Sequence, residues 1–275
     1  MGIKESIGWA TKTWNPVTGC WGPGGTEQQP NRCPYCYAQR LAKRLRGRFG
    51  YPLDDPFAPA FHPERLDQPG RWKAGKRVFV CSMGDLFAPW IRDAVVNTVL
   101  QAAIRHEQHV YFFLTKYAER YGTINSTNGN MFFGVTVENQ HCASKRIPLL
   151  LDGCKGGRFV SIEPMLGPVN LERIITYKNG IYTSWLDALK GKVYHPVCRP
   201  GRNGPSGLIA TDKPKLSWVI LGAQTGPGAK SNAPKQQWID AVVEQTRTSG
   251  VPLFMKQNLA PYWKGELIQE WPEPC

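Results

Sequence analysis

"RVFVCSMGDLFAPWIRDAVVNTVLQAAIRHEQHVYFFLTK" (residues 77–116) decides the fold class of this chain. It opens with a short β-branched run at 77–83, continues with helical spacing over 91–107, and ends in a second apolar run at 109–116. A strand, a helix and a second strand in this order indicate one parallel β-α-β unit. The sequence therefore predicts an α/β protein in which helices cover a parallel sheet.

The same alternation extends to both sides of this unit. A helix is expected at 236–250, where Gly250 supplies the stop signal. Five more apolar runs predict strands at 11–17, 131–139, 158–165, 217–224 and 251–257. Seven β/α units favour a partial or complete TIM-like (β/α) barrel, in a single domain over residues 1–275, and an open doubly wound sheet is the alternative.

One segment, 177–215, interrupts the alternation. It is too long for an ordinary β/α loop and is rich in Gly, Pro, Lys and Arg. We expect an insertion here, a loop or small hairpin on or beside the functional site, although a disordered excursion agrees equally well with this composition.

Polar residues gather where each predicted strand ends. In parallel β/α folds these carboxyl ends share one edge of the sheet, and ligands bind there. The candidate site residues at this edge are Ser82, Met83, Gly84, Asp85, Thr136, Glu138, Asn139, Ser161, Glu163 and Gln224, and Thr115, Lys116 and Lys256 occupy equivalent places.

Three cysteines with the spacing C-x12-C-x2-C lie in the loop at 18–37, on the same expected edge. Cys20, Cys33 and Cys36 suit zinc or an iron–sulfur cluster. Structural zinc normally has four protein ligands, and only Cys198, with His195 before it, offers a second half-site. A [4Fe–4S] cluster on three cysteines leaves one iron without a protein ligand. S-adenosylmethionine can bind that iron through its amino and carboxylate groups.

The ending "CPYC" (33–36) resembles the radical S-adenosylmethionine superfamily, whose usual first gap is three residues where this chain has twelve. In order, "TWNPVTGC…CPYCYAQRLA", "VFVCSMGDLF", "FFLTKYAER", "FFGVTVENQ", "SIEPMLGPVNL" and "WVILGAQTGPGAK…VPLFMKQ" resemble a phage-associated radical-S-adenosylmethionine-like family with a widened cysteine motif. Many of its members have Gly-Gly-Glu-Ser-Gly where this chain has residues 222–226, so their Glu is replaced by Gln224.

This resemblance implies a [4Fe–4S] cluster and S-adenosylmethionine as cofactors, an external one-electron reductant, and roles for the candidate residues. Ser82, Met83, Gly84 and Asp85 would hold the methionine amino group. Thr136, Glu138 and Asn139 would hold the ribose, and Ser161 and Glu163 the ribose or the substrate. Tyr35 would pack on the cluster or the adenine, as would Trp14, although core packing explains these aromatics equally well.

The net charge of +13 favours a polyanionic or phosphate-bearing partner. Basic residues cluster at 39–48 and 71–77. Because relatives of the family occur in phage genomes, the resemblance favours a radical isomerase or lyase acting on a hypermodified base in DNA. The alternatives are a lyase for a free modified nucleobase of the 7-deazaguanine or queuine type, and a non-catalytic, zinc-stabilised nucleic-acid-binding module.

The sequence offers no apolar run long enough to span a bilayer, and its first residues lack the apolar region of a signal peptide. We therefore expect a cytoplasmic protein with reduced thiols and no membrane partner, located in the host cytoplasm if a phage encodes it.

Overall fold

A computed structural model describes residues 7–124, 127–178, 181–197 and 207–273. Its centre is a parallel sheet of seven strands in the order β1-β4-β5-β6-β7-β12-β13. The strands are β1 (Lys12–Trp14), β4 (Arg77–Val80), β5 (Val110–Thr115), β6 (Met131–Thr136), β7 (Gly157–Ile162), β12 (Trp218–Leu221) and β13 (Leu253–Met255).

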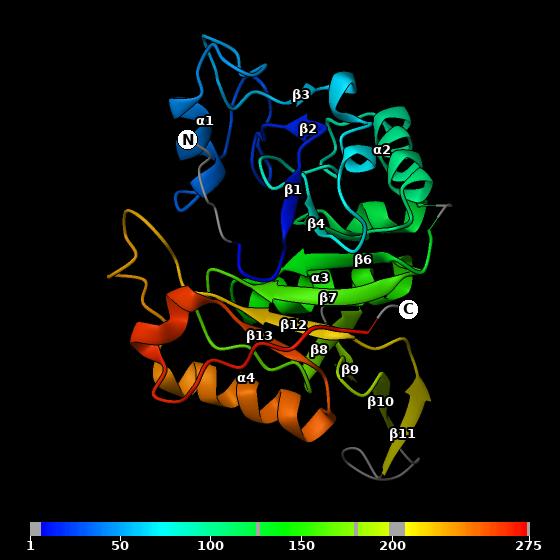
Figure 1. Cartoon of the computed structure of the whole chain (residues 1–275). Helices are drawn as coiled ribbons and strands as arrows, with labels where there is room; N and C mark the ends of the chain where they lie inside the picture. Colours follow the sequence, from blue (N-terminus) through cyan, green and yellow to red (C-terminus); the bar gives the residue numbers. More distant parts are fainter. Residues whose placement is uncertain (1–6, 125–126, 179–180, 198–206, 274–275) are drawn as a thin grey trace.

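The strand order follows the chain from one edge of the sheet to the other. A doubly wound sheet reverses its order at a switch point, so that alternative is excluded. The predicted α/β class and all seven predicted strands are confirmed. Among the described residues the edge strands β1 and β13 do not pair with each other, so the curled sheet is a partial barrel (Figure 1).

Three helices cover the outer face of the sheet: α2 (Asp93–Arg105), α3 (Gln140–Gly153) and α4 (Gln236–Ser249). Each buries an apolar stripe against the sheet, such as Val96, Val99 and Leu100 on α2. Helix α4 ends as predicted at Gly250, whose φ of 67° lies in the left-handed region. In the described part of the chain, no helix combines the length and apolar composition needed to cross a membrane.

The concave face of the sheet is filled by large rings at its amino-terminal end. Trp9 lies at the centre of this group, 4.8 Å from the ring of Phe79 and 5.8 Å from that of Trp218. The remaining members are Phe112, Phe132, Phe159, Ile220 and Phe254. This packing closes the amino-terminal half of the barrel, and open space remains only toward the carboxyl ends of the strands.

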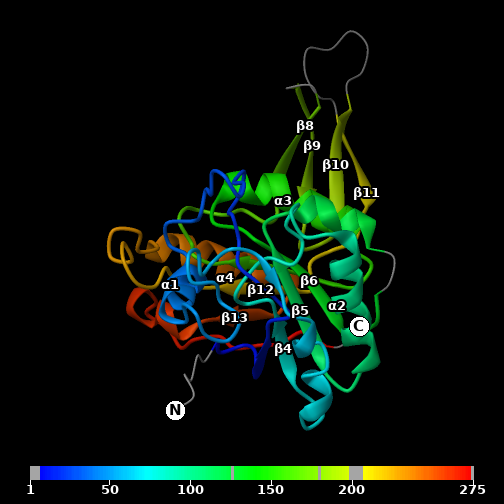
Figure 2. The ribbon, with the colours of Figure 1, turned by 90° about the horizontal axis from the view of Figure 1, so that it is seen from above.

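The interruption predicted at 177–215 is larger than a hairpin. It is an antiparallel sheet of four strands, β8 (Ile174–Lys178), β9 (Ile181–Asp187), β10 (Lys192–Val197) and β11 (Gly207–Asp212). The sheet projects from the body of the protein beside α3 (Figure 2), and Ile174, Leu186 and Val193 pack into the main core at its base. It occupies the place of the crossover helix between β7 and β12, so β-structure replaces a helix there.

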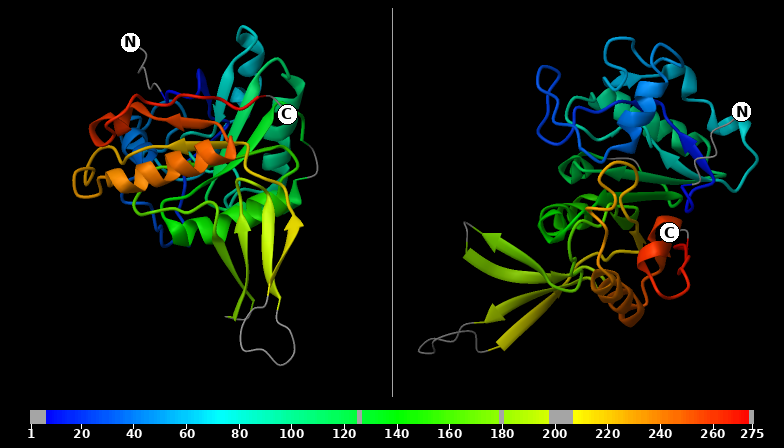
Figure 3. Two further views of the ribbon diagram at one scale, coloured as in Figure 1. Left: turned by 90° about the horizontal axis from the view of Figure 1, so that it is seen from below. Right: turned by 90° about the vertical axis from the view of Figure 1, so that its left-hand side faces the viewer.

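The connection from β1 to β4 carries the cysteine loop. It contains β2 (Val17–Thr18), α1 (Tyr37–Arg44), β3 (Ala60–Phe61) and the short 3-10 helices η1 (Pro63–Arg65) and η2 (Pro69–Arg71). Two further 3-10 helices, η3 (Ala118–Thr123) and η4 (Gln257–Tyr262), follow β5 and β13. Helix α1 and the loop after β12 both lie at the end of the barrel where the strands terminate (Figure 3).

Gly134 provides a test of the packed interior. A Cβ atom at this position on β6 would lie 2.5 Å from the ring of Phe159. We expect Gly134→Ala to lower the free energy of unfolding by about 1–3 kcal/mol, because the displaced ring must leave its rotamer. Chemical denaturation measures this value. Gly122→Ala is the matched control, since no atom lies within 4 Å of its Cβ, and equal stability of both variants would contradict the packing described.

Candidate functional site

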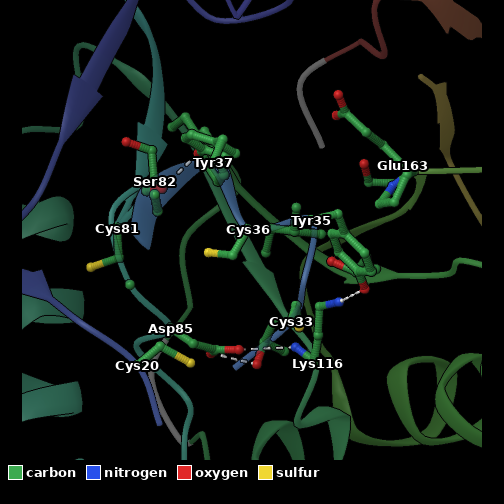
Figure 4. Close-up of a pocket in the computed structure, with 18 of the residues that line it drawn as sticks. Cys20, Cys33, Tyr35, Cys36, Tyr37, Cys81, Ser82, Asp85, Lys116 and Glu163 are labelled. Atoms are coloured by element: carbon green, nitrogen blue, oxygen red, sulfur yellow. Dashed lines mark hydrogen bonds between the residues drawn. The ribbon is translucent and has the colours of Figure 1, made fainter. Parts of the chain in front are cut away.

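A cavity of about 420 Å³ opens at the carboxyl ends of the strands (Figure 4). Most of the residues that the sequence predicts for the site line it: Cys20, Cys33, Tyr35, Cys36, Ser82, Gly84, Asp85, Thr136, Ser161, Glu163 and Gln224. Thr136 and Ser161 are register partners on neighbouring strands, so their side chains stand side by side above the aromatic packing. The shared edge that the strand ends predict is therefore present.

Three of the predicted residues lie behind the cavity wall. Met83 packs against α1 in a small cluster with Ala38 and Ala42, and Asn139 caps α3 by accepting a hydrogen bond from the backbone N–H of Cys142. Glu138 is buried behind Tyr35 and Lys116. Trp14 is also fully buried, with its ring N–H donating to the carbonyl of Arg65, so core packing accounts for it.

Cys20, Cys33 and Cys36 enter the cavity from one loop, and Cys33 lies close enough to Cys20 and Cys36 to contribute to the raised pKa of both. Cys81, which also lines the cavity, turns its sulfur away from them (Figure 4). In the described parts of the chain, no three Cys, His, Asp or Glu side chains stand at the spacing that one metal ion needs. Cys198, the candidate second half-site, lies outside the described residues.

The twelve residues between Cys20 and Cys33 do not separate them in space. The N–H of Asn31 donates to the carbonyl of Trp21 at 2.7 Å, so residues 22–30 form a closed side loop. Nine of the twelve residues between Cys20 and Cys33 belong to this side loop, and the other three are Trp21, Asn31 and Arg32. The path from Cys20 to Cys33 is therefore that of a three-residue gap.

Glycines make the neck of this side loop possible. A Cβ at Gly22, where φ is +85°, would lie 1.9 Å from the carbonyl oxygen of Asn31, and one at Gly25 would lie 2.2 Å from that of Trp21. Such contacts exclude any side chain. Within the loop, the N–H of Gly25 donates to the carbonyl of Gly22 and the amide of Asn31 to that of Pro23.

Hydrogen bonds fasten the cysteine loop to the ends of β4 and β5. The N–H of Gly19 donates to the carbonyl of Met83 at 2.8 Å. The hydroxyl of Tyr37 donates to the carbonyl of Ser82 at 2.6 Å, and that of Tyr117 to the carbonyl of Gly22 at 2.9 Å. Because strands and loop share these bonds, the thiols have fixed positions over the sheet edge.

The surroundings favour neutral thiols when nothing is bound. Burial, with Asp85 nearby, raises the pKa of Cys20 to about 12, and burial also raises the pKa of Cys36. The backbone N–H groups of Gly22 and Gln39 point at these two sulfurs, and Cys36 is the N-cap of α1. These N–H groups and the helix N-terminus oppose the effect of burial and would support thiolates once a cation is present.

Asp85 is held within the protein. It accepts from the hydroxyl of Thr115 at 2.6 Å, and from the backbone N–H groups of Lys116 and Phe87 at 3.0 and 3.1 Å. Burial raises its pKa although these bonds oppose the change. Three of the roughly four acceptor positions of this carboxylate are thus used to join the turn after β4 to β5.

Glu138 is the centre of a second network on the cavity wall. Its carboxylate pairs with Lys116 and with Arg146, and it accepts from the hydroxyl of Tyr35 at 2.6 Å. Lys116 also donates to that hydroxyl and lies 4.9 Å from the ring centre. Burial alone would raise the pKa of Glu138, but the two cations outweigh it and lower this pKa to about 2.

Glu163 and Lys256 form an ion pair at the ends of β7 and β13, and both line the cavity. The end of β12 makes room for this pair, because a Cβ at Gly222 would lie 2.8 Å from the carboxyl carbon of Glu163. The side chains of Glu163 and Lys256 are 24% and 20% exposed, so both can meet a ligand.

Gln224 organises the loop after β12. Its amide nitrogen donates to the carbonyl of Pro227 at 2.7 Å, and its amide oxygen accepts from Asn232 at 2.9 Å. A glutamate has no donor for Pro227. The amide of Gln224 therefore holds the loop after β12 together at the cavity wall.

Arg146 and Tyr117 are two functional neighbours that the sequence did not single out. Arg146 lies in the second turn of α3 and reaches back to Glu138 and to the carbonyl of Thr136. No local motif marks such a contact. Tyr117 follows Thr115 and Lys116 at the end of β5, so its position next to two candidate residues could have identified it as a third.

The network around Glu138 makes stability depend on pH. We expect Glu138→Gln to lower the free energy of unfolding at pH 7 by about 3 kcal/mol, the equivalent of a pKa shift from 4.5 to about 2. Because the folded-state pKa is lowered, this contribution is complete above pH 4.5 and is lost as the pH falls toward 2.

Chemical denaturation of both proteins at pH 7 and at pH 3 measures the difference. Glu244→Gln, at an exposed position on α4, should change stability by less than about 0.5 kcal/mol at either pH. A stability difference for Glu138→Gln that does not shrink at pH 3 would contradict the assigned ion pairs.

Comparison with known proteins gives a family but no activity. Neither the curated proteins nor the solved structures that were searched contain a match. One family model, described as "Protein of unknown function (DUF5131)", matches residues 4–266, which covers the cysteine loop, every strand of the parallel sheet and the cavity. The chain therefore belongs to the family described as Protein of unknown function (DUF5131).

Proposed function

We propose that this protein is a radical S-adenosylmethionine enzyme that acts on a nucleobase. The observation that carries the proposal is the closed side loop at 22–30. It gives Cys20 and Cys33 the connection of a three-residue gap, which is the usual first gap of the superfamily that the sequence resembles. Two residues separate Cys33 from Cys36, so the widened motif then differs from the usual one only by the side loop at 22–30.

The donor set fits a [4Fe–4S] cluster. Three thiols lie in one cavity, the N–H groups of Gly22 and Gln39 point at two of them, and α1 begins at the third. Thiolates are the ligands that iron–sulfur clusters require, and each of the three thiolates would bind a different iron, so they need not converge on one ion. When bound, such a cluster would supply the single electron that cleaves S-adenosylmethionine.

The cavity residues can divide the work of binding that cofactor. Ser82 and Asp85 line the cavity together with the cysteines, and the remaining acceptor position of Asp85 would hold an ammonium group. Thr136 and Ser161 offer neighbouring hydroxyls to a ribose. Glu138 is engaged with Lys116 and Arg146, so we assign it to fixing Tyr35 and Lys116 rather than to the ribose.

The substrate class follows from the size and charge of the cavity. About 420 Å³ is the size of a small-molecule site, so a polymer could present only one extruded base to it. The net charge of +13 favours a base within DNA over a free 7-deazaguanine-type base, and rearrangement or cleavage, as by an isomerase or lyase, is the proposed reaction class. The zinc-stabilised binding module is the rival class.

Anaerobic purification tests the cluster and the cofactor together. We expect brown protein with about four irons and four sulfides per chain. Dithionite and S-adenosylmethionine should then yield 5′-deoxyadenosine and methionine without any substrate. Replacement of Cys20, Cys33 or Cys36 by Ala should abolish both results, since each removes one thiolate.

Cys142→Ser is the matched control, because Cys142 lies on α3 outside the cavity. This variant should keep its iron and its activity. Colourless protein with one zinc per chain would reject the proposal in favour of the binding module, and S-adenosylhomocysteine as the product would indicate methyl transfer instead.

The side loop yields a second prediction. Gly22→Ala should reduce the bound iron at least tenfold, because its Cβ would meet the carbonyl of Asn31 at 1.9 Å and open the neck of the loop. Gly24→Ala should keep the iron. Gly24 shares the left-handed conformation, with φ of +73°, but no atom lies within 4 Å of its Cβ.

Iron content and far-UV circular dichroism, measured on both variants, separate loss of the cluster from loss of the fold. Full iron content in Gly22→Ala would show that the closed neck is not required.

A further inference from the structure

The end of α1 and the turn that follows it carry an unusual concentration of free positive charge. Lys43, Arg44, Arg46 and Arg48 are all exposed. In the described part of the chain, none of the four pairs with a carboxylate. We call these four residues, together with Phe49 and Leu53, the basic rim.

A large apolar side chain stands among these cations. Phe49 is 72% exposed although its φ of 53° is strained for a residue with a side chain. Leu53 nearby is 70% exposed. A phenyl ring kept in water by an unfavourable backbone conformation gains nothing for folding, which points to a role in contact with another molecule.

The turn that carries Phe49 is firmly built. Arg65 donates to the carbonyl of Phe49 at 2.6 Å, and the N–H of Gly47 donates to the carbonyl of Tyr51 at 2.9 Å. Tyr51 is itself buried beneath α1. The ring of Phe49 therefore projects from a rigid support and not from a loose loop.

The basic rim lies beside the cavity. Helix α1 starts at Cys36 and its eight residues extend over about 12 Å, so Arg44 is one short helix away from the thiols. Arg40 on the same helix donates to the carbonyl of Thr225, which joins α1 to the loop after β12 at the cavity mouth (Figure 3). The other basic stretch, 71–77, precedes β4 and lies at the opposite end of the strands.

We propose that the basic rim is a docking surface for duplex DNA, in which the four cations bind phosphates and Phe49 acts as a wedge between base pairs. The proposal rests on the proposed function, because a base in a duplex must leave the stack to reach the cavity. Apolar side chains inserted between base steps unstack them and kink the duplex.

An anionic membrane is the other surface that attracts cations beside apolar groups. Membrane-bound helices bury a continuous apolar face in the lipid. The apolar face of α1 is already buried in the protein, where Ala38 and Ala42 pack against Met83 and Phe57. Within the basic rim, two apolar side chains, Phe49 and Leu53, face four cations that suit a phosphate backbone, and this balance favours DNA.

Binding of the reconstituted protein to a 20-base-pair duplex, measured from about 50 to 200 mM salt, tests the surface. The double variant Arg44→Ala/Arg46→Ala should bind at least tenfold more weakly at 100 mM salt. Its plot of log affinity against log salt should be less steep by about 1.8, because each lost phosphate contact contributes about 0.9. Lys145→Ala/Lys155→Ala is the matched control. It removes one exposed charge within α3 and one just after that helix, and it should bind the duplex like the parent.

The wedge has its own readout. A duplex with 2-aminopurine opposite a mismatched base becomes more fluorescent when that base leaves the stack. The parent protein at saturation should produce this increase. Phe49→Gly should bind with affinity within about threefold yet produce less than a third of the increase. Glycine relieves the strained φ, so we expect this variant to melt no lower than the parent.

Several outcomes overturn the proposal. They are equal salt dependence in the parent and Arg44→Ala/Arg46→Ala, an unchanged fluorescence increase in Phe49→Gly, or binding to phosphatidylserine vesicles with none to the duplex. Iron content and 5′-deoxyadenosine release, assayed without DNA in the same preparations, report the proposed function separately. Intact values with no duplex binding reject the surface alone, and duplex binding through the rim without iron rejects the proposed function alone.

Discussion

The packing of Trp9 against Phe79, Phe112, Phe159 and Trp218 is the constraint on which the rest of the molecule depends. These rings fill the amino-terminal half of the concave face of the curled sheet. Every polar side chain on the concave face must then lie in the carboxyl-terminal half, where the strands end. Among the described residues β1 and β13 do not pair, so the sheet stays open at that side while the rings fill its amino-terminal end.

The neighbouring strands β6 and β7 supply the hydroxyl groups of Thr136 and Ser161 to the cavity lining, and two carboxylates after these strands form ion pairs. Glu138, just after β6, pairs with two cations and accepts from Tyr35, while Glu163, just after the neighbouring strand β7, pairs with Lys256. Two cations on one carboxylate leave the surroundings of Glu138 with a positive excess. The buried carboxylate of Asp85 lies near Cys20 and helps to raise the pKa of that thiol. A bound group that carries positive charge would relieve that repulsion, since it would stabilise both the thiolates and Asp85.

The fold and the location of the site could be predicted from the sequence because both follow from period and order. Alternating apolar runs give the strands, and the shared carboxyl edge follows from parallel pairing. What could not be predicted depends on contacts between distant residues. The four-stranded sheet at 174–212 has no helical or alternating signal strong enough to distinguish it from a loop. Arg146 reaches Glu138 from the second turn of a helix, and Met83 faces away from the cavity although its neighbours Ser82 and Gly84 line it. The end of a predicted strand indicates which residues lie near the edge of the sheet, but the conformation of the following turn determines which of their side chains face the cavity.

The widened cysteine motif illustrates the same distinction between spacing and distance. A gap of twelve residues is incompatible with a compact three-thiol site only if the intervening chain is extended. Here the hydrogen bond from the N–H of Asn31 to the carbonyl of Trp21 brings the two ends of the side loop together. Gly22 and Gly25 allow the backbone at these ends to come into contact. An excursion that closes on itself adds little loop entropy to the site, because its ends are already fixed to each other. Beyond the glycines of the neck, it can therefore lengthen or change its sequence without moving the thiols. The hydrogen bond between Asn31 and Trp21 therefore says more about the distance between the thiols than the number of residues between the first two cysteines does.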